Sequence, residues 1–475
     1  MKSNSILRIV GLTGVLAAAA ACVRYIPKPI SAPGSLDSFE SRRLDTPELR
    51  EFLLASGEVK DWPPAAWDLK ALTLAAFYFH PDMDVARAQW GVARAGRITA
   101  GERPNPSLNP SLGYNSTSPI SEVTPWIPEI ALEIPLEVAG KRGFRVAVAR
   151  QASEAARWNI LSSAWEVRSR LRGALLELYA AERAATLQSE RLKLQTEIVR
   201  ILEVQKSAGE VSTYDVTQAR IALGSIRLET LETARAAEEA RAKIAAALGL
   251  PRNALEGAPF SFDAFRSLSP DFPEGEVRRQ ALLNRSDLLA ALSEYDAGQS
   301  VLRLEIAKQY PDLRIGPGYQ LDQTANKWTI GLAFDLPILS RNKGPIAEAE
   351  ARRTELAARF LALQAKALGE LDAAVADCRA ALLKARVADE LSAALIRQEA
   401  SAVRRREAGE ISTLELTGVR LELNAGALAG LEMLVKAQEA IGRLETAIQC
   451  PLDGKDWIFT KTPARSGTGQ EKKND

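Results

Sequence analysis

AGEVST stands at residues 208–213 and AGEIST at residues 408–413 of one 475-residue chain. Laid over each other without gaps, residues 208–251 and 408–451 share 16 identities in 44 positions. Chance similarity between two helical stretches seldom keeps one register for that long. The repeated hexapeptide therefore indicates a tandem duplication of a larger unit.

The duplication reaches upstream of the hexapeptide with slightly different spacing. PSLNPSLGYN at 106–115 is similar to PDLRIGPGYQ at 311–320, and WIPEIALEIPL at 126–136 is similar to WTIGLAFDLPI at 328–338. A period this long is not that of a short-repeat solenoid. We therefore predict three segments: repeat 1 over 70–251, an equatorial connector over 252–274, and repeat 2 over 275–451.

The distribution of proline predicts long helices. None of the 24 prolines falls within 136–250 or 346–450, and proline is excluded from helix interiors because it removes a hydrogen bond and clashes with the preceding turn. Each stretch is interrupted once by the hexapeptide, whose glycine fits a helix C-cap and whose serine fits the next N-cap. The hexapeptides are therefore predicted to be the turns of two long helical hairpins, with tips at Gly209 and Gly409.

In each predicted hairpin the helix before the turn, here called descending, is longer than the helix after the turn, here called ascending. Repeat 1, for example, has a descending helix over 143–208 and an ascending helix over 212–249. At about 1.5 Å per residue, a further helix is needed to match the height. The helical segments that open the repeats, at about 70–102 and 276–308, are the candidates, and we expect each to complete the column of the opposite repeat.

Four segments alternate apolar and polar residues with the period of a β-strand. They occupy 108–115, 126–137, 313–322 and 327–336. Alternation over about ten residues with interface aromatics is typical of a transmembrane β-barrel, and a half-buried soluble sheet is the alternative. The candidate membrane-interface aromatics are Tyr114, Trp126, Tyr319 and Trp328.

The number of strands predicts an oligomer. Four strands cannot close a membrane barrel, because the smallest have eight, and open sheet edges are not tolerated in lipid. If the strands cross a membrane, three copies of the chain supply twelve strands. The strand count thus predicts an oligomer, and twelve strands would correspond to a homotrimer.

The N-terminus is typical of an export signal. Basic residues precede an apolar stretch, 9–21, that ends in small residues, so we expect residues 1–21 to be a signal peptide. The AAC at 20–22 resembles a bacterial lipobox and favours a lipid-bearing Cys22. A free thiol at Cys22, or cleavage elsewhere, is the alternative.

Two further segments are weakly patterned. We expect 22–69 to be a lipid-anchored, extended tether with one short helix near 46–56. Residues 452–475 contain few apolar side chains, and we expect them to form a disordered tail.

Composition argues against several function classes. The chain has 61 basic and 60 acidic residues, so no net field recruits nucleic acid. With one His and three Cys, a metal site is not expected, and His80, followed by Pro81, marks a turn before a helix. Cys378 and Cys450 would lie at different heights of the hairpin, which favours small buried apolar roles over a disulfide. No catalytic motif is present, so we expect no enzyme, no catalytic residues, no cofactor and no bound metal.

Taken together, residues 70–451 resemble the TolC-like outer-membrane efflux proteins. The resemblance rests on the duplication, on NPSL and YPDL before the first strand of each repeat, and on EIPLEVAGKRGFR and DLPILSRNKG between strand and helix. It also rests on the paired tips AGEVSTYDVTQAR and AGEISTLELTGVR. VAGKRGFR is most similar to the heavy-metal resistance branch of the family.

The resemblance implies a mostly α fold with a small β part. Tandem-duplicated hairpins would form an α-barrel, and four transmembrane strands per chain would complete a trimeric 12-stranded β-barrel. The implied function is a passive exit duct for small toxic compounds or metal ions. It would lie in the outer membrane of a diderm bacterium and extend across the periplasm. The implied partners are a periplasmic adaptor and an inner-membrane pump of the proton-driven resistance-nodulation-division type.

The resemblance also implies a gate at the tips, where polar contacts constrict the periplasmic mouth. Asp215 and Glu415 match acidic tip positions of the family. We hypothesise that the arginines at 404–406 pair across helices with these carboxylates or with Glu210; a solvated charge run at a helix C-terminus is the alternative. The predicted gate and adaptor-contact residues are Gly209, Glu210, Asp215, Arg404, Arg405, Arg406, Gly409, Glu410 and Glu415.

Two other functions fit parts of the pattern. A lipid-anchored periplasmic scaffold with a soluble sheet would need neither a trimer nor lipid-facing strands. A duct for protein secretion would keep the architecture and change only the cargo.

Overall fold

The computed structural model describes residues 25–57, 62–116, 124–268 and 274–452. The predicted signal peptide and Cys22 therefore lie outside the described residues, as does the predicted tail beyond Leu452. The chain divides into two compact units, 1–43 and 44–475. The first contains α2 (Ala32–Glu40), which was not predicted from the sequence and which begins at Ser31, whose hydroxyl accepts a hydrogen bond from the Gly34 amide at 3.2 Å.

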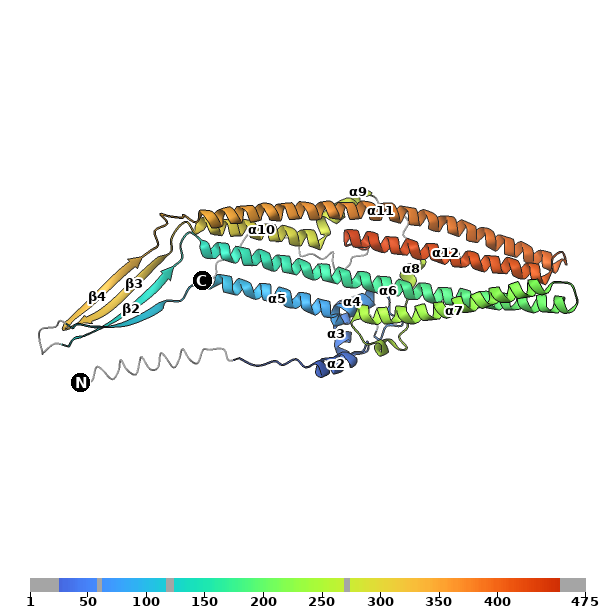
Figure 1. Cartoon of the computed structure of the whole chain (residues 1–475), viewed down its shortest axis with the longest axis horizontal. Helices are drawn as coiled ribbons and strands as arrows, with labels where there is room; N and C mark the ends of the chain where they lie inside the picture. The colour runs from blue at the N-terminus through green and yellow to red at the C-terminus, as the bar shows by residue number, and fades with distance from the viewer. Residues whose placement is uncertain (1–24, 58–61, 117–123, 269–273, 453–475) are drawn as a thin grey trace. The chain divides into compact units, whose positions relative to one another are not determined.

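The second unit uses one plan twice, as the duplication predicts (Figure 1). The first copy contains α4 (Leu69–Phe79), α5 (Pro81–Gly101), β1 (Ser107–Tyr114), β2 (Trp126–Leu136), α6 (Lys141–Ser207) and α7 (Thr213–Leu248). The second contains α9 (Glu274–Asn284), α10 (Ser286–Ala307), β3 (Leu313–Asp322), β4 (Ala325–Ala333), α11 (Lys343–Glu407) and α12 (Thr413–Ile448). The fold is therefore mostly helical with a small sheet, as predicted.

The helix that opens each repeat is broken; the turn at His80 was predicted from the sequence, whereas the break in the second repeat was not. The breaks fall at His80 and at Arg285, each of which has an extended backbone and is the N-cap of the next helix. Pro81 explains the first break, because proline fits the first turn of a helix and disfavours helical geometry in the preceding residue. No proline accounts for the second.

Each column of helices closes within its own repeat, which corrects the expectation that the opposite repeat supplies the upper helix. The end of α7 abuts the start of α5. Gly249 there has φ +72°, and a Cβ at this position would lie 2.8 Å from the Phe79 carbonyl oxygen. In repeat 2, the Gln449 side chain at the end of α12 accepts a hydrogen bond from the Ser286 amide at 2.8 Å, at the start of α10.

The four strands form one antiparallel sheet in the order β1-β2-β3-β4. Each repeat contributes one hairpin, and the repeats join through β2 and β3, where Leu136 pairs with Leu313. The strands connect the outer ends of the helices, so the sheet lies opposite the hairpin turns (Figure 1). Both outer strands, β1 and β4, leave an edge without a partner strand in the described chain.

The main core forms where α6 packs against α4, the end of α7 and the connector, which contains η1 (Arg252–Leu255) and α8 (Asp263–Arg266). Leu171 and Leu175 of α6 and Phe265 of α8 are fully buried. Leu49 and Leu53 of α3 (Pro47–Ala55) are also fully buried in this core. The predicted short helix is therefore present, but it is packed rather than part of an extended tether.

Candidate functional site

One face of the sheet is almost wholly apolar. Cross-strand partners share a face and side chains alternate along each strand, so the pairing register defines both faces. Among the described strand residues, the polar side chains on this face are the hydroxyls of Tyr114 and Tyr319 and the amide of Asn326. The face comprises Leu108, Pro110, Leu112, Tyr114, Trp126, Pro128, Ile130, Leu132, Ile134, Leu136, Leu313, Ile315, Pro317, Tyr319, Leu321, Asn326, Trp328, Ile330 and Leu332.

The predicted interface aromatics form two cross-strand pairs on this apolar face. Tyr114 pairs with Trp126 and Tyr319 pairs with Trp328, and in each pair the ring centroids are 4.9 Å apart. The Tyr319 hydroxyl donates to the Asn326 side-chain oxygen at 2.6 Å. Each pair lies near the turn of its hairpin, so the aromatic rings gather toward the end of the sheet that is remote from the helices.

The opposite face of the sheet carries the charges. Ser111 donates to the Glu129 carboxylate at 3.1 Å. Arg314 lies 3.5 Å from Glu133, and Lys327 forms an ion pair with Asp322. The sheet therefore separates a face suited to lipid from a face suited to water, as the alternation in the sequence predicts.

Where strands meet helices, Asp312 joins the two repeats. Its carboxylate accepts from the Val138 amide at 3.1 Å and from the Lys141 ammonium at 2.8 Å. Lys141 begins α6 and its side chain is 8% exposed. The strand-to-helix segment of repeat 1 is thereby fixed by the segment that precedes β3 in repeat 2.

The two tips have the same backbone geometry. Gly209 and Gly409 both have φ +78°, and the next amides donate back to carbonyls of the preceding helix, from Glu210 to Gln205 and from Glu410 to Arg405, each at 2.9 Å. This is the hydrogen-bonding pattern of a Schellman C-cap. The predicted role of the hexapeptide as a hairpin turn is confirmed.

The predicted acidic tip residues cap the helices that follow. Asp215 and Ser212 form a reciprocal capping box, and Glu415 and Ser412 form the equivalent one. Hydrogen bonds from the Ser212 hydroxyl and amide lower the pKa of Asp215, and those from the Ser412 amide and hydroxyl lower the pKa of Glu415. This role was not predicted from the sequence, although Ser-x-x-Asp and Ser-x-x-Glu are recognisable capping patterns.

The tip arginines make contacts within their own hairpin. Arg405 lies 3.3 Å from Glu410, and Arg406 donates to the Thr413 hydroxyl at 3.0 Å. The carbonyl of Arg404 accepts from the Ala408 amide at 3.0 Å. The hypothesised pairing of these arginines across helices with Asp215, Glu415 or Glu210 stays a prediction.

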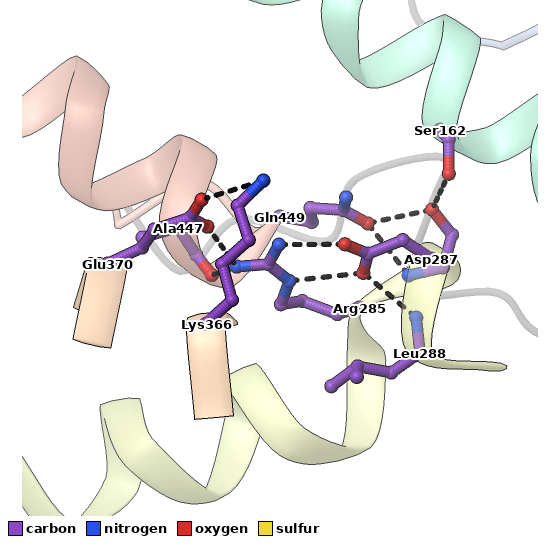
Figure 2. Close-up of polar contacts among 9 residues, drawn as sticks. Ser162, Arg285, Asp287, Leu288, Lys366, Glu370, Ala447 and Gln449 are labelled. Atoms are coloured by element: carbon purple, nitrogen blue, oxygen red, sulfur yellow. Dashed lines mark hydrogen bonds and ion pairs between the residues drawn. The ribbon is translucent and has the colours of Figure 1, made fainter. Parts of the chain in front are cut away.

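A cluster of polar contacts centred on Arg285 joins α10, α11 and α12 (Figure 2). The guanidinium is 8% exposed, bonds both oxygens of Asp287 at 3.1 and 2.7 Å, reaches Glu370 at 3.0 Å and donates to the Ala447 carbonyl at 3.2 Å. Burial opposes the charge, but the Asp287 and Glu370 carboxylates outweigh it and raise the pKa of Arg285. The cation also faces the C-terminus of α12, where the helix dipole favours it.

Gln449 completes this cluster, as Figure 2 shows. Its side-chain oxygen accepts from both the amide and the hydroxyl of Ser286 at 2.8 Å, and the Ser286 and Ser162 hydroxyls lie 2.7 Å apart. A cavity of about 810 Å³ adjoins the cluster between α6, α11 and α12. The cluster was not predictable from the sequence, because its members are far apart in the chain and belong to no motif.

Three further observations on the described residues concern membrane-spanning helices, metal sites and a cysteine. None of their helices has an apolar stretch long enough to cross a membrane. Within the same residues, no group of three or more His, Cys, Asp and Glu side chains is arranged to hold a metal ion. Cys378 is fully buried, and burial raises the pKa of its thiol to about 11.

Comparison with known families identifies the first repeat. The family described as Outer membrane efflux protein matches residues 78–250, from the end of α4 to the end of the α6/α7 hairpin. Over these residues the chain is similar to the outer membrane efflux proteins. The resemblance predicted from the duplication, the strands and the tips is thus confirmed.

Two curated proteins of this kind are similar to the chain. The cobalt-zinc-cadmium resistance protein CzcC of Cupriavidus metallidurans is 27% identical over 215 residues, which are 45% of this chain and 50% of that protein. The pyoverdine export outer membrane protein OpmQ of Pseudomonas aeruginosa is 22% identical over 300 residues, 60% of this chain and 61% of that protein. The chain thus spans about half to three fifths of the curated relatives that it matches.

The fold extends over more of the chain than the sequence identity does. The crystal structure of the outer membrane protein VceC from Vibrio cholerae superposes with a TM-score of 0.65 and 20% identity, over 80% of this chain and 95% of that one. An identity this low shows the fold alone. The fold shared with that outer membrane protein therefore extends over more of the chain than the family match, which ends at residue 250.

Proposed function

We propose that the protein is the outer-membrane channel of a tripartite efflux system and acts as a passive exit duct across the periplasm. One observation carries this proposal: a sheet with an apolar face and a charged face is attached to two long helical hairpins. Such a sheet suits lipid on one side and water on the other. The hairpins would extend the water-filled path away from the membrane.

The open sheet edges support the proposed homotrimer. Lipid does not tolerate an unpaired edge, so β1 and β4 must pair with other copies if the sheet crosses a membrane. Four strands per chain give the predicted twelve-stranded barrel in a trimer.

The duplication suggests how the helices of neighbouring copies meet. Leu428 and Leu431 of α12 line one cavity with α6. Their counterparts in repeat 1, Leu228 and Leu231 of α7, are each 69% exposed. In a ring of alternating repeats, α7 would pack on α11 of the next copy as α12 packs on α6. The exposed apolar residues of α11 that suit this contact are Leu383, Val387 and Leu391.

The proposed partners are a periplasmic adaptor and an inner-membrane pump of the proton-driven resistance-nodulation-division type, because an open duct supplies no energy of its own. The proposed cargo is small toxic compounds or metal ions. The names of the two curated relatives, a cobalt-zinc-cadmium resistance protein and a pyoverdine export protein, support this range without choosing between its members. The proposed location is the outer membrane, with a lipid anchor on Cys22.

The proposed gate lies at the tips, where polar contacts between adjacent hairpins close the periplasmic mouth until the adaptor docks. The exposed residues that could meet across hairpins include Arg406, Glu210 and Glu410. At Gly209 and Gly409, no atom lies within 4 Å of the place that a Cβ would occupy, which leaves the turn backbone open to the adaptor.

Native mass spectrometry of the protein extracted from outer membranes tests the proposal. A trimer with added lipid mass on each chain is the expected result. A lipidated monomer that survives gentle extraction would overturn the duct, because four strands would then remain without partners, and would favour the scaffold function instead. A trimer without lipid mass would refute only the anchor on Cys22.

A further inference from the structure

A buried charged cluster lies where α6 of repeat 1 meets α12 of repeat 2. The Glu445 carboxylate is 3.0 Å from Arg168 and 3.4 Å from Arg172, and the three side chains are 8%, 4% and 9% exposed respectively. Arg172 also donates to the backbone and side-chain oxygens of Gln438 at 2.8 and 3.0 Å. We call Arg168, Arg172, Gln438, Gly442 and Glu445 the α6–α12 lock.

Two members of the lock restrict what can stand beside α6. A Cβ at Gly442 would lie 2.5 Å from Nη1 of Arg172, so a side chain at this position would displace the guanidinium from its present place against α12. Gln438 donates to the carbonyls of Phe265 and Ser267 at 3.2 and 2.9 Å, which ties the lock to the connector. Burial lowers the pKa of Arg172 and the Glu445 carboxylate opposes this shift.

The duplicated helices lack the lock. The residues of α7 that correspond to Gln438, Gly442 and Glu445 are Glu238, Ala242 and Ala245. The residues of α11 that correspond to Arg168 and Arg172 are Leu368 and Asp372. If α7 occupied the place of α12, a methyl group would meet the Arg172 guanidinium and Arg168 would lose the carboxylate of Glu445. The Glu238 carboxylate would replace the Gln438 amide, which donates to two connector carbonyls.

This difference matters because α7 and α12 are otherwise alike. Both are 36 residues long and begin with the same capping box. In a duplicated chain that assembles with copies of itself, a homologous helix from a second copy competes for the same surface. Removing the partner of a buried charge is strongly unfavourable, and an unpaired charge is an effective way to reject a wrong partner.

We propose that the α6–α12 lock sorts the homologous hairpins: it accepts α12 on this face of α6 and rejects α7 of a second copy. The inference rests on the proposed trimer, which brings a second α7 within reach. It goes further by naming the residues that keep the two repeats in alternating order. The cost is a charged cluster at a position that apolar side chains could fill.

Two further ion pairs also differ between the repeats. They lie where α5 and α10 begin. Arg170 of α6 lies 2.5 Å from Asp82 at the start of α5, and Glu370 of α11 lies 3.0 Å from Arg285 at the N-cap of α10. Arg170 and Glu370 are equally far from their hairpin turns, so this position carries opposite charges in the two repeats. If α5 packed on α11, Asp82 would face Glu370.

Disulfide cross-linking can report which helix stands beside α6. The hydroxyls of Ser169 and Thr446 are 3.1 Å apart, so Ser169→Cys with Thr446→Cys in one chain reports correct packing. Ser169→Cys and Ala246→Cys in two co-expressed chains report α7 in the place of α12. Both sets carry Cys378→Ala and Cys450→Ala, and chains without the added cysteines show the background.

The decisive variant replaces the charges by apolar groups: Arg168→Leu, Arg172→Leu and Glu445→Leu together. Replacing a buried ion cluster by apolar residues often preserves stability, so we expect the variant to fold. We expect the intermolecular 169/246 link to rise by more than about tenfold over the background of the intact lock. Glu439→Ala, an exposed change on the same helix, should leave that link unchanged.

Grafting the residues of α7 onto α12 provides an independent check. Gln438→Glu, Gly442→Ala and Glu445→Ala leave α6 intact, and we expect the intramolecular 169/446 link to fall by more than about tenfold. A folded, trimeric apolar variant with the 169/246 link still at background would overturn the lock. A monomeric wild-type protein in native mass spectrometry would instead count against the proposed duct, so the two failures are distinguishable.

Discussion

The carboxylate of Asp312 and the ammonium of Lys141 lie 2.8 Å apart, although the two residues are 171 positions apart in the chain. Asp312 precedes the first strand of repeat 2, and Lys141 begins the long helix of repeat 1. Because the Lys141 side chain is buried, the pair fixes the two halves of the chain to each other at the level where the sheet ends and the helices begin.

Asp312→Asn should weaken this joint. The change removes the charge that faces a buried ammonium, and a hydrogen bond to a charged group contributes about 1.5–3 kcal/mol. We expect a loss near the lower end of that range, because the Asp312 side chain is 40% exposed. Thermal unfolding in detergent measures it. Asp335→Asn is the matched control: Asp335 is 89% exposed beside Arg314, and an equal loss there would contradict the special role of Asp312.

His80 should make stability depend on pH. Burial lowers its pKa, with Asp82 raising it and Arg170 lowering it further. Because the unfolded chain then binds the proton more readily than the folded one, stability is complete above the unfolded pKa of about 6.5 and falls as the pH drops below it. His80 is the one histidine of the chain, so few other side chains titrate in this range.

His80→Asn isolates that contribution. Asn retains an oxygen that can accept from the Asp82 amide, as Nδ1 of His80 does at 3.1 Å. Between about pH 7.5 and 5.5, we expect the thermal midpoint of the wild-type protein to fall and that of the variant to stay nearly constant. Parallel falls in both proteins would show that His80 is not the titrating group.

The turn at the second tip should require a glycine, because the backbone there has a positive φ angle. Gly409 has φ +78° and open space around a Cβ position, so Gly409→Ala adds no clash and costs about 1 kcal/mol or more through backbone strain alone. Gly418→Ala lies inside α12 and should gain about 0.5–1 kcal/mol. Hydrogen exchange near residue 409 measures both. Similar effects of the two changes would argue against a strained turn.

Ring closure can be tested with the counterparts of the α6–α12 contact. Gly369 of α11 and Ala246 of α7 correspond to Ser169 and Thr446, and both are exposed in the single chain. If neighbouring copies repeat the internal contact, Gly369→Cys with Ala246→Cys should cross-link chains up to the trimer on a non-reducing gel. Gly344→Cys with Ala246→Cys should not, because Gly344 lies at the sheet end of α11.

The tip arginines should restrict leakage through the mouth. Arg406→Glu reverses a charge beside Thr413 and should loosen the contacts between tips. Exposed pairs contribute only about 0–1 kcal/mol each, so we expect about a two- to fivefold rise in susceptibility to a large antibiotic that the outer membrane excludes. Arg397→Glu, further up α11, is the control. Unchanged susceptibility of cells carrying Arg406→Glu would remove Arg406 from the gate.

Sequence reasoning reached the features that local patterns encode. The hairpin turns follow from glycine and serine at fixed positions, and the strands follow from strict alternation, so the apolar face and the pairs Tyr114/Trp126 and Tyr319/Trp328 were predictable. The break at Arg285 was not, because no proline marks it. The charged clusters around Arg285 and Glu445 were not either, because burial of an arginine depends on residues that are distant in the chain.

The sequence also did not predict which helices stack on each other to form the columns. Helix lengths predict that a second helix must complete each column, but they do not say which one. The answer depends on Gly249, whose backbone lets α7 meet Phe79 of its own repeat. A glycine at the end of a helix is an ordinary C-cap signal, and nothing in the sequence indicates what packs against it.

That each repeat completes its own column has an evolutionary consequence. One repeat already contains both helical columns and one β-hairpin, and it needs no part of the other repeat to reach its full height. Six half-length chains could therefore satisfy the geometry that three full-length chains are proposed to satisfy here. Gene fusion of such an ancestor would have left two kinds of boundary, one inside each chain and one between chains, free to diverge separately. In the present chain, the buried arginines of the α6–α12 lock lie only at the boundary inside each chain.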